Sequence, residues 1–242
     1  MGSAARPSTL TAVVVRRALN EQEGALGESP LWPAAAIVAS AVLYADLPSR
    51  FIAGPDAGAF GVVLWVVPGL ALLVVAALVV VRPLGHLTRR YLAMGTIAIV
   101  SAANSASIVL LIHLLLGGAS ANASPLLRAA VHMWVVNVLL FALWYWQLDG
   151  GGPTDRPHCA PADRDFLFPQ QTEPTLLAKG WRPLFLDYLY VSFTNAAAFS
   201  PTDTMPLSRW AKMLMLVQSA ISLALAVMVV ARAVNILRVV GS

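Results

Sequence analysis

Charged residues are scarce in this 242-residue chain. They make up 12% of it, whereas a soluble domain carries roughly 25%. Hydrophobic residues make up 58%, and the mean hydropathy is +0.73. This composition excludes an ordinary soluble domain and predicts a protein embedded in a lipid bilayer.

The usual signatures of enzymes are absent as well. The chain has no glycine-rich phosphate loop, no His-Glu-x-x-His motif, no nucleophile elbow and no pair of Cys-x-x-Cys ligands. Its only cysteine is Cys159, which excludes an internal disulfide framework. We therefore expect neither an enzyme nor a bound cofactor.

One polar stretch collects the residue types that bind metals, but without a recognised ligand spacing. We expect a solvated loop there and no metal site. The residues concerned are Asp155, His158, Cys159, Asp163 and Asp165.

Long apolar runs dominate the rest of the chain. Residues 59–81, for example, match the ~20 residues that a helix needs to cross ~30 Å of hydrocarbon. Helix is expected because lipid offers the backbone no hydrogen-bond partners. The predicted fold class is an all-α, polytopic membrane helix bundle in the cell membrane, with about six segments. They are approximately 32–47, 59–81, 92–116, 127–148, 183–199 and 207–234.

Composition also divides the chain into four parts. Residues 1–30 are a polar N-terminal lead, and 31–148 form a four-helix transmembrane region. Residues 149–182, rich in glycine and proline, are expected to lie on the membrane surface as a loop. Residues 183–242 are expected to form a helical hairpin.

The net charge of +4 comes from basic residues at the ends of apolar runs, so we expect lipid headgroups rather than nucleic acid as their partners. Residues 82–91 contain three arginines and no acid, and such connections lie in the cytoplasm. With the N-terminus inside, four spans would return 149–182 to the cytoplasmic side.

The fifth segment, 183–199, is short and leaves two topologies open. If it crosses the membrane, the chain has six crossings and Arg232 and Arg238 lie inside. If it is re-entrant and returns to the side it left, there are five crossings and these two arginines lie outside. The charge rule favours six.

Polar residues inside the middle spans must face protein or water, because an unpaired amide in lipid costs several kcal/mol. Asn104 shares a helix face with Ser101 and Ser105, His113 follows further along that helix, and Asn137 lies in the next span. Hydrogen bonds between helices are the commoner explanation. A polar pathway through the bundle is the alternative.

The last two segments carry the most informative polar residues. Gln218 and Ser222 lie one turn apart in an otherwise apolar helix. Asp187 is the only acid inside an apolar stretch of the second half. An intramembrane carboxylate is a functional candidate, although Asp187 is also close enough to the start of its segment to lie at the interface.

The sequence from 187 to 209 resembles the pore module of tetrameric potassium channels. In that family a short pore helix rich in aromatic, Ser and Thr residues leads to a selectivity filter, an acid, a proline and the inner helix. The matching residues here are Tyr190, Ser192 and Thr194 for the pore helix, Asp203 for the acid, and Pro206 and Arg209 for the entry to the inner helix. The resemblance covers the last third to half of the chain, with residues 127–148 as the outer helix.

The filter itself departs from the family. Aligned on Asp203, it falls on residues 198–202, Ala-Phe-Ser-Pro-Thr, which contain no glycine. The family's filter directs successive carbonyls at the ion and uses backbone conformations that glycine permits, whereas Pro201 has a fixed φ. The resemblance therefore implies a channel-like scaffold without that family's potassium filter.

The leading functional expectation is a channel-like protein, homo-oligomeric, with a pathway for an inorganic ion. Its pore-lining candidates are Asp187, Ser192, Thr194, Asn195, Ser200, Thr202, Asp203, Gln218 and Ser222.

Two alternatives stay open. In the first, the chain is a structural or partner-binding membrane protein whose hairpin packs without a pore. Ser200 or Thr202 then caps the last helix, and the negative charge of Asp203 interacts favourably with the N-terminal end of the helix dipole. In the second, the chain is a secondary transporter that uses Asp187 and His113 as a proton relay.

Overall fold

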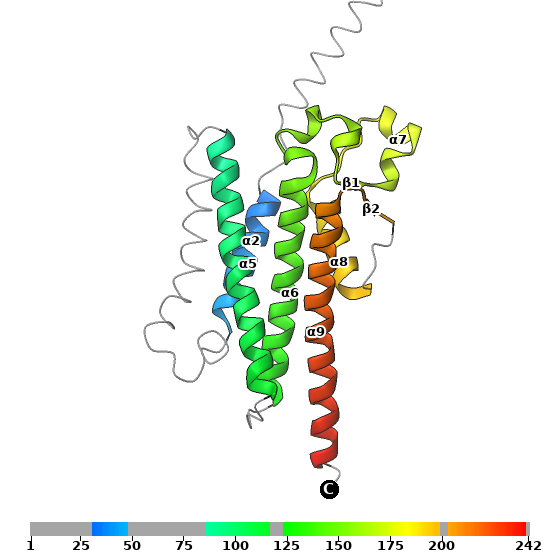
Figure 1. The fold of residues 1–242 in the computed structure, drawn as a ribbon. Coiled ribbons are helices and arrows are strands. Elements are labelled where there is room, and N and C mark those ends of the chain that lie inside the picture. The colour runs from blue at the N-terminus through cyan, green and yellow to red at the C-terminus, as the bar shows by residue number, and fades with distance from the viewer. Residues whose placement is uncertain (1–30, 48–85, 117–122, 199–202, 241–242) are drawn as a thin grey trace, which may run out of the picture.

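The computed structural model describes residues 31–47, 86–116, 123–198 and 203–240 (Figure 1). The N-terminal lead and the expected span 59–81 lie outside these ranges. The described part is mostly helical, and its longer helices are α2 (Leu31–Ala45), α5 (His86–Leu116), α6 (Ala123–Leu148), α8 (Phe185–Ala198) and α9 (Arg209–Val240).

Three of these helices are long and apolar enough to cross a membrane, which agrees with the membrane class expected from composition. The apolar stretches are Arg90–His113 in α5, Leu126–His158 beginning in α6, and Arg209–Ala231 in α9. α2 is apolar but shorter, with 15 residues. The expected segments 32–47, 92–116, 127–148 and 207–234 thus coincide with helices.

α6 is the central helix of the bundle, and α2, α5, α8 and α9 all pack against it. Small and medium side chains let these neighbours approach: Ala129, Met133 and Ala142 are fully buried. α2 runs antiparallel to α6, because Ile37 packs in the cluster of Leu143 while Tyr44 packs in the cluster of Met133.

Residues 149–183 fold into a cap over one end of the bundle (Figure 1). The sequence predicts a loop here, and the structure shows short helical turns, one strand and the helix α7. These elements are η1 (Asp149–Gly151), η2 (Arg156–His158), η3 (Pro161–Asp163), β1 (Phe166–Leu167), η4 (Pro169–Gln171) and α7 (Pro174–Ala178).

Glycines let the chain reverse directly after α6. Gly150, Gly151 and Gly152 all have positive φ angles, which glycine adopts at little cost. A Cβ on Gly150 would lie 2.8 Å from the sulfur of Cys159, and one on Gly152 would lie 2.9 Å from the carbonyl oxygen of Gln147. The cap can therefore fold back tightly onto the helix end.

α8 and α9 begin at the same end of the bundle, the end that carries the cap. Tyr188, in the first turn of α8, bonds to Asp149. The strand just before α9, β2 (Met205–Pro206), pairs antiparallel with β1 of the cap. Both helices then run away from the cap, because Ser192 and Asn195 lie level with residues 215–219 of α9.

The residue that caps α9 differs from the expected one. The helix begins at Arg209, and the hydroxyl of Ser208 accepts a hydrogen bond of 3.1 Å from the backbone N–H of Ala211, as an N-cap does. Asp203 lies before β2, five residues upstream of this cap. The expectation that the Ser-Pro-Thr-Asp run caps the helix is therefore wrong, because a strand separates the two.

Candidate functional site

A buried polar network joins α6, α8 and α9, with the amide of Gln218 at its centre. The Gln218 Oε1 accepts hydrogen bonds from the Tyr145 hydroxyl at 2.6 Å and from the Asn195 amide at 2.9 Å. Its Nε2 donates to the hydroxyl of Ser192 at 2.7 Å and to the carbonyl oxygen of the same residue at 2.9 Å. Every oxygen and N–H of this amide thus faces another protein group.

The partners of Gln218 are themselves satisfied. The Ser192 hydroxyl donates to the backbone carbonyl of Val138 on α6 at 2.6 Å. Asn195 donates to the carbonyl of Met215 at 3.0 Å and accepts from the hydroxyl of Ser219 at 3.1 Å. Hydrogen bonding of this completeness makes a buried polar group tolerable in an apolar interior.

A second contact lies further along the same interface. Asn137 of α6 donates to the hydroxyl of Ser222 at 3.1 Å, and both side chains are buried. The predicted pore-lining candidates therefore have partners within the chain: Ser192, Asn195 and Gln218 bond to one another, and Ser222 bonds to Asn137. The positions are one turn apart on α9, as the sequence indicates, but the stripe faces α6 and α8.

The opposite face of α9 is apolar from Met213 to Ala231. Its exposed large side chains from the second turn onward are Met213, Leu216, Val217, Leu223, Val227 and Val230. Such a face suits lipid or a neighbouring apolar surface, and it offers no polar group to a passing ion.

The remaining candidates near the hairpin have other surroundings. Asp187 accepts a hydrogen bond of 2.7 Å from the backbone N–H of Leu184 and so caps the start of α8. The hydroxyl of Thr194 bonds back to its own helix, at the carbonyls of Tyr190 and Val191. Asp203 is exposed. Ser200 and Thr202 lie outside the described residues.

The candidates in the middle spans are only partly brought together. Ser101 of α5 accepts from the indole N–H of Trp144 at 3.1 Å, which is a hydrogen bond between helices. Asn104 is buried, and its Oδ1 has no partner within the described ranges. His113 is exposed near the end of α5 that points away from the cap, so it lies far from Asp187 and makes no relay with it.

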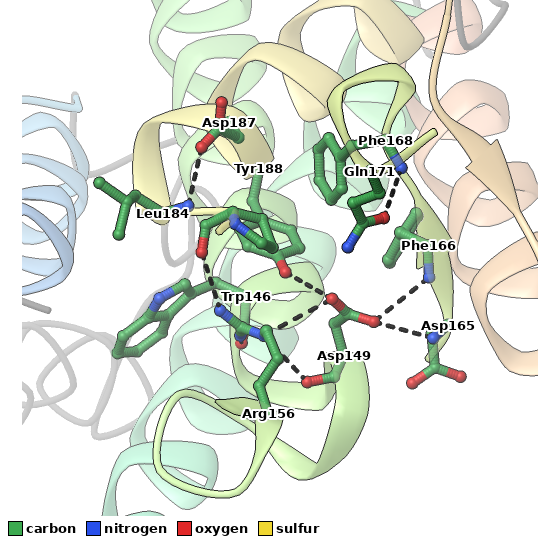
Figure 2. Close-up of polar contacts among 11 residues, drawn as sticks. Trp146, Asp149, Arg156, Asp165, Phe166, Phe168, Gln171, Leu184, Asp187 and Tyr188 are labelled. Carbon is green, nitrogen blue, oxygen red and sulfur yellow. Dashed lines mark hydrogen bonds and ion pairs between the residues drawn. The ribbon is translucent and has the colours of Figure 1, made fainter. Parts of the chain in front are cut away.

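The cap contains a buried ionic centre that sequence analysis missed (Figure 2). The Asp149 carboxylate is fully buried. Its Oδ2 accepts from the Tyr188 hydroxyl at 2.5 Å and lies 3.5 Å from Nε of Arg156. Its Oδ1 accepts from the backbone N–H groups of Asp165 at 2.8 Å and Phe166 at 3.2 Å.

Arg156 is held as completely as Asp149. Its guanidinium donates to the backbone carbonyls of Asp149, Trp146 and Pro183 and lies over the ring of Tyr188, 4.7 Å from the centroid. These contacts join the end of α6, the cap and the start of α8. An aromatic cluster packs beside them, with Phe168 and Tyr188 at 5.3 Å between centroids.

A weak signal for this centre does exist in the sequence. Asp149 ends an apolar helix and precedes three glycines, which is a position where the chain turns back on itself. Arg156 follows seven residues later. Composition alone cannot separate such a pair from the many exposed charges of a polar loop.

The candidate metal ligands of the cap form no site. Within the described ranges no group of three or more His, Cys, Asp or Glu side chains is arranged to hold a metal ion. Asp155 instead forms an ion pair of 3.2 Å with Arg90 at the start of α5.

An open apolar groove of about 460 Å³ runs along the outside of α6 and α8, between Trp134, Val138, Leu189 and Phe193. Its lining is suited to acyl chains or to apolar side chains of another protein. Comparisons of the chain with models of protein families, with curated proteins and with solved structures find no match.

Proposed function

We propose that this chain is a channel-like integral membrane protein of the cell membrane, in which α8 is a re-entrant helix and several copies surround an ion pathway. The observation that carries the proposal is the shared direction of α8 and α9. Both begin at the cap and run away from it, so the chain must come back between them.

The length of α8 agrees with the re-entrant segment that its direction indicates. Its 14 residues span ~21 Å at ~1.5 Å per residue, which is shorter than the ~30 Å hydrocarbon layer. Non-helical backbone at membrane depth is tolerated where protein buries it or where it lines water. The re-entrant alternative with five crossings is therefore preferred to the six crossings that the charge rule favours.

The order of the parts also agrees with the resemblance noted in the sequence. An outer helix (α6), a surface segment (the cap), a short helix (α8), a returning segment and a long helix (α9) follow one another as they do in pore modules of potassium channels. In this arrangement Ser192, Asn195 and Gln218 hold α8 against its neighbours. The pathway is assigned to the return segment, residues 199–204, of several copies.

The charge distribution favours a cation. The C-terminal end of a helix carries a partial negative charge of roughly half a unit, and that end of α8 points away from the cap, close to the level of Ser219 of α9. Asp203 adds a carboxylate in the return segment, where Ser200 and Thr202 supply hydroxyl groups. Because the return segment lacks the filter glycines, we do not expect it to select potassium over sodium by the mechanism of that family.

The side on which the cap lies distinguishes this protein from the family. Arg90 and its partner Asp155 bring the arginine-rich start of α5 to the cap, and the charge rule places that end in the cytoplasm. In potassium channels the pore loop opens on the outer face. Cys159 is the only cysteine and lies partly exposed in the cap, so labelling of intact cells with an impermeant maleimide determines the side.

Ion flux tests the proposal directly. The purified chain in liposomes is expected to pass potassium and sodium, and Asp203→Asn is expected to lower the flux several-fold. Asp163→Asn, which removes an exposed acid of the cap, is the matched control and should leave the flux unchanged. A folded protein that passes no monovalent ion would overturn the channel proposal, and a monomer by native mass spectrometry would overturn its oligomeric part.

A second candidate is a non-conducting structural or partner-binding membrane protein. The completeness of the hydrogen bonds around Gln218 within one protomer favours it, because no polar group of that network is left to face a pathway. It predicts no flux from a stable, folded protein. The transporter alternative has less support, since His113 and Asp187 lie at different levels of the bundle.

A further inference from the structure

The Asp149 carboxylate is bound both to α8 and to the cap, at Arg156 and at the start of strand β1. One oxygen, Oδ2, faces Tyr188 of α8 and Arg156 of the cap. The other, Oδ1, accepts the two consecutive backbone N–H groups of residues 165 and 166. Figure 2 shows these contacts converging from different elements on one side chain.

The strand that Asp149 holds, β1, pairs with β2, the strand that follows Asp203. Phe166 pairs with Pro206, and Leu167 pairs with Met205. The backbone N–H of Leu207 also donates to the carbonyl of Asp165 at 2.7 Å. A single residue, Thr204, separates Asp203 from the first residue of β2. A shift of β1 would therefore move β2 and with it the carboxylate assigned to the pathway.

We infer that Asp149 is a positioning residue that sets the location of Asp203 through β1 and β2. Arg156 and Tyr188 hold its carboxylate in place. The position of Asp203 is therefore fixed relative to the ends of α6 and α8. The role of Asp203 in this inference rests on the proposed channel function. The mechanical step from Asp149 to β2 does not.

A thiol cross-link between β1 and β2 tests how Asp149 affects the position of β2, and it requires no measurement of ion flux. Leu167→Cys and Met205→Cys are introduced into a Cys159→Ser background. Residues directly opposite in an antiparallel pair have Cβ atoms ~4.5–5.5 Å apart, which is within reach of oxidation or of a short bifunctional reagent. The rate of cross-linking reports how closely β2 is held against β1.

Two substitutions of Asp149 separate its acceptor role from its charge. Asp149→Asn keeps a side-chain oxygen for the two N–H groups and is expected to retain most of the cross-linking rate. Asp149→Leu removes the acceptor and is expected to slow cross-linking about tenfold, while circular dichroism shows that the helices persist. An unchanged rate in a folded Asp149→Leu protein would overturn the inference.

A substitution on the strand covers the case in which Asp149→Leu does not fold. Asp165→Pro removes one N–H donor to Asp149 and leaves the contacts of Asp149 with Arg156 and Tyr188 in place. The preceding residue, Arg164, has a ψ of 144°, which suits a residue before proline. Asp165→Ala, which keeps the N–H, is its matched control. Slower cross-linking in the proline variant alone supports the inference, and equal rates in both overturn it.

Flux measured on the same variants keeps the two proposals apart. Slower cross-linking together with altered cation flux supports both. Slower cross-linking in a protein that never conducts supports the positioning role of Asp149 and overturns the channel function. An unchanged cross-linking rate overturns the positioning role, whatever the flux.

Discussion

Two buried polar centres in the described part of the chain are stabilised in different ways. The centre in the cap is ionic, with the Asp149 carboxylate against the guanidinium of Arg156. The network around Gln218 is neutral and consists of amides and hydroxyls. Burying an ion is far more costly than burying an amide, so the charges lie at the end of the bundle and the neutral groups lie among the helices.

This difference predicts a ranking of mutational effects. When either partner of a buried ion pair is removed, the other charge stays buried without compensation, and the free energy of unfolding falls strongly. A network of neutral groups loses its hydrogen bonds one at a time, each of them worth less. Four substitutions, in order of decreasing effect on the free energy of unfolding, test this ranking by SDS titration in mixed micelles followed by circular dichroism.

Arg156→Met should have the largest effect. It leaves the Asp149 carboxylate buried without its cation, and such a loss costs ~3–5 kcal/mol. Lys179→Met removes an exposed charge of the same cap and serves as control, with an expected change within ~0.5 kcal/mol. Equal stabilities of the Arg156 variant and the parent would show that the pair is not needed.

Gln218→Leu comes next. The side chain makes four hydrogen bonds across helices, and such bonds in membrane proteins average ~0.6 kcal/mol. The expected loss is therefore ~2–3 kcal/mol. Met213→Leu, on the exposed face of the same helix, should be nearly neutral. A loss larger than that of Arg156→Met would reverse the comparison between the two centres.

Ser222→Ala removes one hydrogen bond, the one donated by Asn137. The expected loss is ~0.6–1.7 kcal/mol, and Ser105→Ala on the exposed side of α5 should cost less. In the double variant with Asn137→Leu the two losses should not add, because residues that share a contact are coupled. Strict additivity would argue against the hydrogen bond.

Thr194→Val should have the smallest effect, below ~0.5 kcal/mol. Its hydroxyl bonds only to carbonyls of its own helix, which already take part in the helical ladder. Ser192→Ala, two residues earlier, removes bonds to both α6 and α9 and should cost more. If valine at position 194 proved the more harmful change, the face assigned to α8 would be wrong.

The helices themselves could be predicted from the sequence, because hydropathy and length decide whether a segment suits a membrane. The expected segments 92–116 and 127–148 end where α5 and α6 end, and they start six and four residues after those helices begin. The direction of α8 relative to α9 could not be predicted, because an apolar segment has the same composition whether it crosses or returns. Pairing of β1 with β2, between residues ~40 positions apart, decides the matter.

The sequence identifies Ser192, Asn195 and Gln218 as candidates, but it identifies neither their partner Tyr145 nor the direction in which these side chains point. The sequence shows that Ser192, Asn195 and Gln218 must avoid lipid, and the structure agrees, since all three are buried. Whether such side chains face a pathway or one another depends on how the helices are rotated about their axes. That rotation is set by contacts between helices, so it cannot be deduced from the periodicity of one helix.

The helix directions carry a consequence for the two ends of the described bundle. α2, α5 and α9 run away from the cap and α6 runs towards it, so Leu31 and Val240 lie at opposite ends of the bundle (Figure 1). In a bilayer, an epitope fused ahead of Leu31 and one fused behind Val240 would then be exposed in different compartments. The first would share its compartment with the cap, and the second would mark the opposite face.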